Sequence, residues 1–277
     1  MTPDVPQISV IIVSWNVKES LCRCLDSIFT AKYPRLEVIV LDNNSSDGTA
    51  SEVKKKFAHK LKLIANRQNL GFPKAVNQGL VAAKGEYFLI LNPDTRLPAD
   101  FFRLCLDFAR QNPGFGVMGP RFTDPDGSSQ GSVFPEPTLV AAIRKYWLGD
   151  DSAYNKYTPE ASHPVSVNSS VNSVSGGCLF FSRSTMEKVG ILTEKVFMYF
   201  EDLDYCRRIH RAGLPVIFHP GITIIHEHGQ SAAKSPDTQK YIRDAGLWYH
   251  GPFKYYLITT VIRSRQIIDK IISGKRS

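Results

Sequence analysis

The first half of the chain alternates between short apolar runs and segments with helical spacing, and this alternation constrains the fold more than any other feature. The apolar runs predict strands at residues 8–14, 36–42, 61–66 and 86–92. The segments between them predict helices at residues 18–31, 45–57 and 72–84. Repeated βαβ units at this spacing predict an α/β fold with a mostly parallel sheet covered by helices on both faces.

The fourth strand ends in a polar turn. Residues 87–91 are continuously apolar and lie between Gly85 and Pro93, as expected for a strand that is buried on both faces. Pro93 has no N–H to donate to a sheet, so the strand should end near Asn92. Asn92 and Asp94 then lie at the carboxyl edge of the sheet, where ligands bind in open α/β folds, although Asn-Pro-Asp is also ordinary turn chemistry.

The second half of the chain is less regular. Residues 124–172 are rich in Pro, Ser, Gly and Asn and predict loops around one short amphipathic helix at residues 139–149. Beyond them we expect a strand at residues 178–183, a helix at 201–213, two strands at 215–220 and 222–229, and a helical C-terminus from residue 253.

Composition limits the class of protein. The 277 residues are 43% hydrophobic, which suits one large domain with appendages. No apolar run is long enough to cross a bilayer, and the first residues lack the pattern of a signal peptide. The five cysteines are scattered without metal-site spacing, and these features together predict a cytoplasmic protein.

The net charge of +8 is concentrated at the C-terminus, where residues 254–277 hold six Lys or Arg and one acid, Asp269. A basic balance suits nucleic acid, anionic lipid or a phosphorylated substrate. No RNA-binding aromatic signature or zinc finger is present, so we expect no nucleic-acid partner. The tail predicts either a helix packed on the domain or a helix lying on an anionic membrane.

Two polar clusters follow the second and third strands. Asp42 ends its strand too early to cap the next helix, a role that suits Asp47 or Ser46 better. Gly71 can provide a turn, and the helix that starts after it could help to hold phosphate together with Lys74.

Two further clusters hold acids and imidazoles. Glu201 and Asp202 are expected to precede a helix, whereas Asp204 can pair with an arginine one turn later. In the last strand, alternation places His226 and His228 on one face and the glutamate between them on the other. Two imidazoles on one face suit a metal or a diphosphate.

Taken together, these clusters resemble the family 2 inverting glycosyltransferases, which have the GT-A fold, over about residues 7–235. The order of the motifs matches, and their forms are most similar to the rhamnosyltransferase branch. The matching stretches are VIIVSWN, LDNNSSDGT, NLGFPKAVNQG, LNPDT, FEDLDYC and IIHEHGQS. One departure is Asn92, which stands where the family has the first acid of Asp-x-Asp and brings no charge to a metal.

The resemblance implies transfer of a sugar from a nucleoside diphosphate sugar, such as dTDP-rhamnose or a UDP-hexose, to an acceptor hydroxyl in cell-surface polysaccharide synthesis. It implies that Asp202 is the catalytic base and that Asp94 and His226 hold Mg²⁺ or Mn²⁺. Glu201 and His228 are implied contacts to phosphate or acceptor. The implied nucleotide-binding residues are Ser14, Asn16, Asp42, Asn44, Lys74 and Asn92.

The same resemblance implies one GT-A domain over residues 1–240, with a nucleotide-binding half (1–123) and an acceptor half (124–240), followed by a basic helical tail (241–277). A saccharide or lipid-linked saccharide acceptor would suit peripheral contact of this tail with the inner face of the plasma membrane. Three other functions stay open at this point: a sugar-1-phosphate nucleotidyltransferase, a non-catalytic nucleotide-binding protein and a lipid-surface adaptor.

Overall fold

A mixed sheet forms the centre of the computed structural model, which describes residues 5–150, 153–154, 169–227 and 237–274. Within these residues the sheet has ten strands, in the order β3-β2-β1-β4-β11-β6-β12-β5, with β7 and β9 paired at its side. A separate ribbon joins β8 and β10. The strands are β1 (Ile8–Ser14), β2 (Leu36–Asp42), β3 (Lys62–Ala65), β4 (Tyr87–Leu91), β5 (Thr95–Arg96), β6 (Val117–Thr123), β7 (Ser129–Gln130), β8 (Val133–Phe134), β9 (Ser169–Ser170), β10 (Ser173–Val174), β11 (Cys178–Ser182) and β12 (Val216–His226).

The predicted parallel sheet is confirmed for the first four strands. β1 pairs in parallel with both β2 and β4, and β2 pairs in parallel with β3. β11 enters antiparallel between β4 and β6, a position that the pattern of apolar runs does not reveal. The carboxyl ends of β1, β2 and β4 therefore meet at one edge, and Ser14 lies beside Asp42 in the register.

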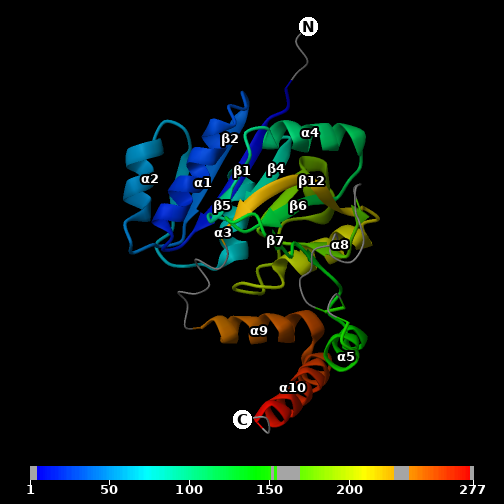
Figure 1. Ribbon diagram of the computed structural model, residues 1–277. Coiled ribbons are helices and arrows are strands. Elements are labelled where there is room, and N and C mark those ends of the chain that lie inside the picture. The colour runs from blue at the N-terminus through cyan, green and yellow to red at the C-terminus, as the bar shows by residue number, and fades with distance from the viewer. Residues whose placement is uncertain (1–4, 151–152, 155–168, 228–236, 275–277) are drawn as a thin grey trace.

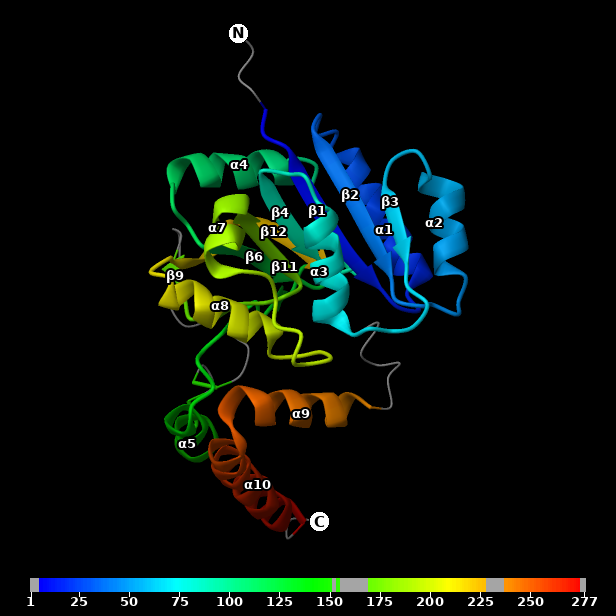
Figure 2. The ribbon, with the colours of Figure 1, turned by 180° about the vertical axis from the view of Figure 1, so that it is seen from behind.

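Helices cover both faces of the sheet, as Figures 1 and 2 show from opposite sides. α1, α2 and α4 pack against the face that Ile8, Val10 and Ile12 share, whereas α3, α7 and α8 pack against the face of Ile11 and Val13. This double cover explains why the strands are apolar on both sides. The helices are α1 (Lys18–Thr30), α2 (Thr49–Phe57), α3 (Phe72–Ala82), α4 (Phe101–Gln111), α5 (Leu139–Leu148), α7 (Arg183–Val189), α8 (Glu201–Arg211), α9 (Thr238–His250) and α10 (Pro252–Gly274).

Two predicted boundaries in the second half are wrong. The two strands expected at residues 215–220 and 222–229 form one strand, β12, whose pairing with β6 shifts between His219 and Thr223. Pro220 lies within this irregularity, because its missing N–H is tolerated where regular pairing is interrupted. Glu201 and Asp202 do not precede α8 but form its first turn.

The C-terminal helices lie below the carboxyl edge of the sheet, together with α5 (Figures 1 and 2). The expected division after residue 240 falls inside α9, which is tied to the domain: Tyr241 stacks on Phe197 with ring centroids 4.3 Å apart, and the Arg207 guanidinium lies 3.6 Å from the ring centroid of Tyr249. α10 packs on α5 and α9 and then projects outward. Among the described residues, no helix is long and apolar enough to span a membrane.

Candidate active site

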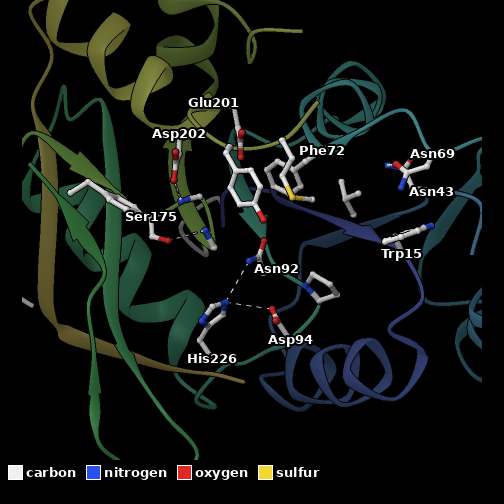
Figure 3. Close-up of a pocket in the computed structure, with 17 residues that line it drawn as sticks. Trp15, Asn43, Asn69, Phe72, Asn92, Asp94, Ser175, Glu201, Asp202 and His226 are labelled. Carbon is white, nitrogen blue, oxygen red and sulfur yellow. Dashed lines mark hydrogen bonds and ion pairs between the residues drawn. The ribbon is translucent and has the colours of Figure 1, made fainter. Parts of the chain in front are cut away.

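A cavity of about 300 Å³ opens at the carboxyl edge of the sheet (Figure 3). Five of the predicted site residues line it: Asn92, Asp94, Glu201, Asp202 and His226. Figure 3 shows Asn92, Asp94 and His226 along one wall and the two acids of α8 across the cavity from them. The other lining residues are Val13, Trp15, Asn43, Asn69, Phe72, Pro93, Phe134, Ser175, Gly176, Gly177, Met198 and Tyr199.

The turn after β4 brings Asp94 to His226. β4 ends at Leu91, and after Pro93 the chain enters β5, where Thr95 pairs with His226 at the end of β12. The Glu227 N–H donates to the Asp94 carbonyl oxygen over 2.7 Å and locks the turn to that strand end. Asp94 Oδ1 then lies 3.5 Å from His226 Nε2, with both side chains buried.

This pair suits a divalent cation. A carboxylate oxygen and an imidazole nitrogen are ligands that Mg²⁺, Mn²⁺ and related ions accept. Asn92 Nδ2 lies 3.5 Å from the same His226 nitrogen, so an amide flanks the pair. Within the described residues, no group of three or more His, Cys, Asp or Glu could hold a metal. A cation bound to Asp94 and His226 would complete its coordination with other oxygen donors, such as those of water or substrate.

The neighbouring Glu227 points away from this cavity, as strand alternation predicts. Its carboxylate forms ion pairs with Arg23 of α1 and with Arg96 of β5, the latter at 3.3 Å. The side-chain hydrogen bond and charge of Arg23 hold the pKa of Glu227 below its usual range. The ion pairs anchor the strand end from which His226 faces the cavity.

Asp202 is held in a fixed orientation at the start of α8. Its Oδ2 accepts from the Gly176 N–H over 2.9 Å, and its Oδ1 accepts from the Leu203 N–H over 2.8 Å. Gly176 allows this approach, because a Cβ there would lie 3.2 Å from the Asp202 Cβ. Hydrogen bonds of this kind stabilise the ionised carboxylate, which lies at the cavity wall.

Glu201 presents a different environment. Its side chain is buried, and Oε2 has no hydrogen-bond partner among the described residues. Burial and, to a lesser degree, the charge of Asp202 raise the pKa of Glu201 to about 8. Burial thus favours the protonated form of Glu201 next to Asp202.

The two residues before α8 adopt a rare backbone conformation. Tyr199 and Phe200 have φ angles of 74° and 64°, in the left-handed region that bulky residues seldom occupy. Phe200 packs against Tyr249 of α9, with ring centroids 5.1 Å apart. Strain of this kind persists where surrounding contacts hold it, and here it directs Glu201 and Asp202 toward the cavity.

Asp42 and Ser14 lie beside the cavity but do not line it. Asp42 Oδ2 accepts from the Ser45 N–H over 3.2 Å. Asp42 Oδ1 and Ser14 Oγ are both buried without a hydrogen-bond partner among the described residues. Unsatisfied buried acceptors are rare and suggest a ligand that provides the missing donor.

Three other predicted residues are placed elsewhere. Asn44 and Lys74 are exposed, and neither they nor Asn16 line the cavity. Asn16 Oδ1 accepts from the Ser46 N–H over 2.8 Å and so joins two loops. At the N-terminus of α3, where a phosphate contact was expected, the Phe72 N–H already donates to a backbone carbonyl oxygen over 2.8 Å. His228 lies outside the described residues.

Sequence reasoning missed a buried amide network at the same edge. Asn43, not Asn44, faces inward: its Nδ2 donates to Asn69 Oδ1 over 3.1 Å, and its Oδ1 accepts from Asn66 Nδ2 over 2.9 Å. Trp15, which follows β1 directly, lines the cavity. Both residues directly follow a strand end and belong to stretches from which other site residues were predicted. Their position was therefore the feature that could have identified them.

Known proteins resemble this chain in sequence. The model of the family described as glycosyl transferase family 2 matches residues 9–190. The N-acetylglucosaminyl-diphospho-decaprenol L-rhamnosyltransferase of Mycobacterium tuberculosis is 28% identical over an alignment that covers 90% of this chain and 88% of the relative. A poly-beta-1,6-N-acetyl-D-glucosamine synthase of Staphylococcus epidermidis is 25% identical over 77% of this chain and 48% of the synthase.

Solved structures share the fold. The mannosyltransferase PcManGT from Pyrobaculum calidifontis, in complex with GDP-Man and Mn²⁺, is 19% identical and superposes with a TM-score of 0.60 over 99% of this chain and 81% of its own. TarS of S. aureus, in complex with UDP-GlcNAc, is 17% identical with a TM-score of 0.59 over 87% and 66%. The expected glycosyltransferase fold is thereby confirmed. Because the family model covers well over half of the residues, this chain belongs to glycosyl transferase family 2.

Proposed function

We propose that this glycosyltransferase transfers a sugar from a nucleoside diphosphate sugar to an acceptor hydroxyl with inversion, using Asp202 as the base and Asp94 with His226 as the cation site. The observation that supports this proposal is the cavity itself. One wall holds the buried pair Asp94 and His226, and the opposite wall holds an oriented carboxylate. Facing walls of one cavity would thus supply the two requirements of the reaction, charge neutralisation and proton removal.

Asp202 would act on the acceptor. In the transfer step, the acceptor oxygen forms a bond to the anomeric carbon while the bond from that carbon to the diphosphate oxygen breaks. The acceptor proton passes to Asp202, and the nucleoside diphosphate leaves. The two backbone N–H groups that hold the Asp202 carboxylate fix its direction, and general-base catalysis depends on such positioning. Burial favours the protonated form of Glu201 beside it, which would limit the negative charge next to an incoming hydroxyl.

Asp94 and His226 would hold Mg²⁺ or Mn²⁺, whose charge would stabilise the departing diphosphate. Their chemistry fits such an ion, and the solved structure of PcManGT contains Mn²⁺. Asn92, next to the pair, would contact the nucleotide rather than add charge to the cation site.

The nucleotide would bind near Asp42. Its unsatisfied Oδ1 suits the ring N–H of a uracil or thymine, and Ser14 Oγ lies beside it in the register. Since this oxygen is buried, base binding requires the turn after β2 to shift. We propose dTDP-rhamnose or a UDP-hexose as the donor, because the M. tuberculosis relative bears the name of a rhamnosyltransferase.

The acceptor would be a lipid-linked saccharide in cell-surface polysaccharide synthesis, as the name of the same relative suggests. We propose peripheral membrane contact on the cytoplasmic side, and a surface of α5 and α10 supports the membrane contact. We call it the α5–α10 platform, and it consists of large apolar side chains left exposed: Val140, Ile143, Trp147, Leu148, Phe253, Tyr256, Leu257, Ile267, Ile268, Ile271 and Ile272. The two helices are joined by a hydrogen bond from Trp147 Nε1 to the Val261 carbonyl oxygen over 3.2 Å.

Charge on α10 favours an anionic surface. Lys254, Arg263 and Lys270 are exposed on this helix, and the single acid Asp269 already pairs with Arg265 at 2.9 Å. A packed C-terminal helix would bury its apolar side, but Ile258 is the one fully buried large apolar residue among those described in α10. The projecting platform therefore agrees better with the membrane proposal than with a helix packed along its length.

A donor screen tests the proposed function. Purified protein is incubated with dTDP-rhamnose, UDP-glucose, UDP-GlcNAc and GDP-mannose, each with Mn²⁺ or with EDTA, and a lipid-linked GlcNAc acceptor. We expect release of dTDP or UDP that requires Mn²⁺, and a product whose anomeric configuration by NMR is inverted relative to the donor. Binding of a nucleotide sugar without turnover of any donor would favour a non-catalytic nucleotide-binding protein.

A further inference from the structure

Both polar atoms of the Gln130 side chain contact His226. Gln130 belongs to the two-residue strand β7 and is buried. Its Oε1 lies 3.0 Å from His226 Nδ1, and its Nε2 donates to the His226 carbonyl oxygen over 2.7 Å. The second N–H of the same nitrogen donates to Asp124 Oδ1. One amide therefore contacts both the ring and the backbone of a single histidine.

The direction of the Gln130 amide follows from its partners. If Oε1 and Nε2 exchanged places, an oxygen would face two acceptors, the His226 carbonyl oxygen and Asp124 Oδ1. Neither acceptor can supply a proton, so that orientation would lose both hydrogen bonds. Oε1 must then face His226 Nδ1, and because Oε1 can only accept, Nδ1 must bear the proton.

The other ring nitrogen is thereby left as an acceptor. A proton on Nε2 would face Asp94 Oδ1 at 3.5 Å, which is longer than an effective hydrogen bond. The 3.0 Å contact between Nδ1 and Gln130 is of normal length, so the shorter contact determines the tautomer of the neutral ring.

We propose that Gln130 is a positioning residue that fixes the Nδ1–H tautomer of His226 and holds the Nε2 lone pair toward Asp94. The cation role of that lone pair rests on the proposed function, whereas the tautomer does not. Metal-binding histidines usually donate their second N–H to an outer partner, and loss of such a partner typically costs about 10–100-fold in metal affinity. β7, which contributes no residue to the cavity wall, would then control the strength of the cation site.

The first test needs no metal and no variant of Gln130. Long-range ¹H–¹⁵N NMR of metal-free protein labelled with ¹⁵N-histidine, at a pH where the ring is neutral, reports which ring nitrogen bears the proton. The His226 signals are assigned by their loss in His226→Ala. We expect a protonated Nδ1 and an unprotonated Nε2. A wild-type ring protonated at Nε2 would overturn the proposal, whatever the enzyme binds.

The second test uses Gln130→Met, which keeps the length of the side chain and removes its hydrogen bonds. We expect the tautomer to become mixed or to shift to Nε2–H, and the Mn²⁺ affinity measured by EPR to fall about 10–100-fold. Gln111→Met, on the exposed end of α4, is the matched control and should change neither measurement.

The two measurements separate the two proposals. Unchanged tautomer and Mn²⁺ affinity in folded Gln130→Met, with folding checked by thermal unfolding, would overturn the role of Gln130. Wild-type protein that shows the Nδ1–H tautomer but binds no Mn²⁺ would support the positioning by Gln130 and contradict the proposed cation site.

Discussion

Asp94 and His226 face each other across 3.5 Å, although one follows β4 and the other ends β12, more than a hundred residues later in the chain. The short strand β5, which starts one residue after Asp94 and pairs with the end of β12, brings them together. A two-residue strand is therefore the element that joins the two halves of the proposed cation site.

Removal of either member of this pair should abolish the stimulation of transfer by Mn²⁺. We expect Asp94→Ala and His226→Ala to reduce Mn²⁺ affinity by more than the roughly 10–100-fold typical of an outer partner. Titration of Mn²⁺ in a transfer assay measures this loss, with His59→Ala on the exposed end of the α2 region as control. Full activity of wild type in excess EDTA would contradict the metal role.

Asp42→Ala should weaken the binding of UDP or dTDP. The buried Oδ1 has no partner among the described residues, so a base N–H would satisfy this acceptor once the turn after β2 has shifted. Loss of such a partner typically costs about 1–3 kcal/mol, which isothermal calorimetry resolves. Asp26→Ala, on the exposed side of α1, controls for the lost charge. Equal affinity of Asp42→Ala and wild type would exclude Asp42 from the nucleotide site.

Glu201 should make the free energy of unfolding dependent on pH. Its pKa is about 8 in the folded protein against a usual value of 4.5, so the folded state holds the proton more tightly. The stability that this proton provides is fully present below pH 4.5 and is lost as the pH rises toward 8. Glu201→Gln stays neutral and should gain stability relative to wild type over this range.

Urea unfolding at about pH 5, 6.5 and 8, which span this pH range, measures the difference in the free energy of unfolding between Glu201→Gln and wild type. Glu187→Gln, on the exposed face of α7, should show no such trend. If the difference in the free energy of unfolding between Glu201→Gln and wild type stays constant from about pH 5 to 8, Glu201 is ionised in the folded protein.

The α5–α10 platform should bind anionic vesicles. Each Lys or Arg near an anionic membrane contributes about 1 kcal/mol, so the charge reversal Arg263→Glu with Lys270→Glu should weaken binding by at least about 2 kcal/mol, or about thirtyfold. Co-sedimentation with phosphatidylglycerol vesicles at low salt measures this change. Lys54→Glu with Lys55→Glu, exposed on α2, is the matched control. If wild type stays in the supernatant at low salt, the platform does not bind membranes.

The parts of the fold that could be predicted are those that local pattern decides. Continuous apolar runs located β1, β2 and β4, and Pro93 marked the end of β4 at Leu91. The insertion of β11 between β4 and β6 depends on pairing with distant strands, which no local pattern encodes. The helix expected from residue 201 begins there, but the left-handed conformation of Phe200 just before it could not be predicted, because its residue type does not favour it.

The site divides in the same way. Asn92, Asp94, Glu201, Asp202 and His226 were predictable because each lies at the end of an element in a recognisable motif. Asn43 was missed in favour of its neighbour, because burial decides which of two adjacent amides faces inward. The contacts of Gln130 join β7 to the end of β12 and depend entirely on tertiary structure.

The most direct test compares Asp202→Asn with Asp204→Asn in a transfer assay, with donor affinity measured by calorimetry. Both acids lie in the first turn of α8, but Asp204 pairs with Arg208 and does not line the cavity. An amide cannot accept the acceptor proton, so Asp202→Asn should slow transfer by about 10²–10⁴-fold with donor affinity nearly intact, while Asp204→Asn transfers at nearly the wild-type rate. Near-wild-type transfer by Asp202→Asn would contradict the assignment of the base.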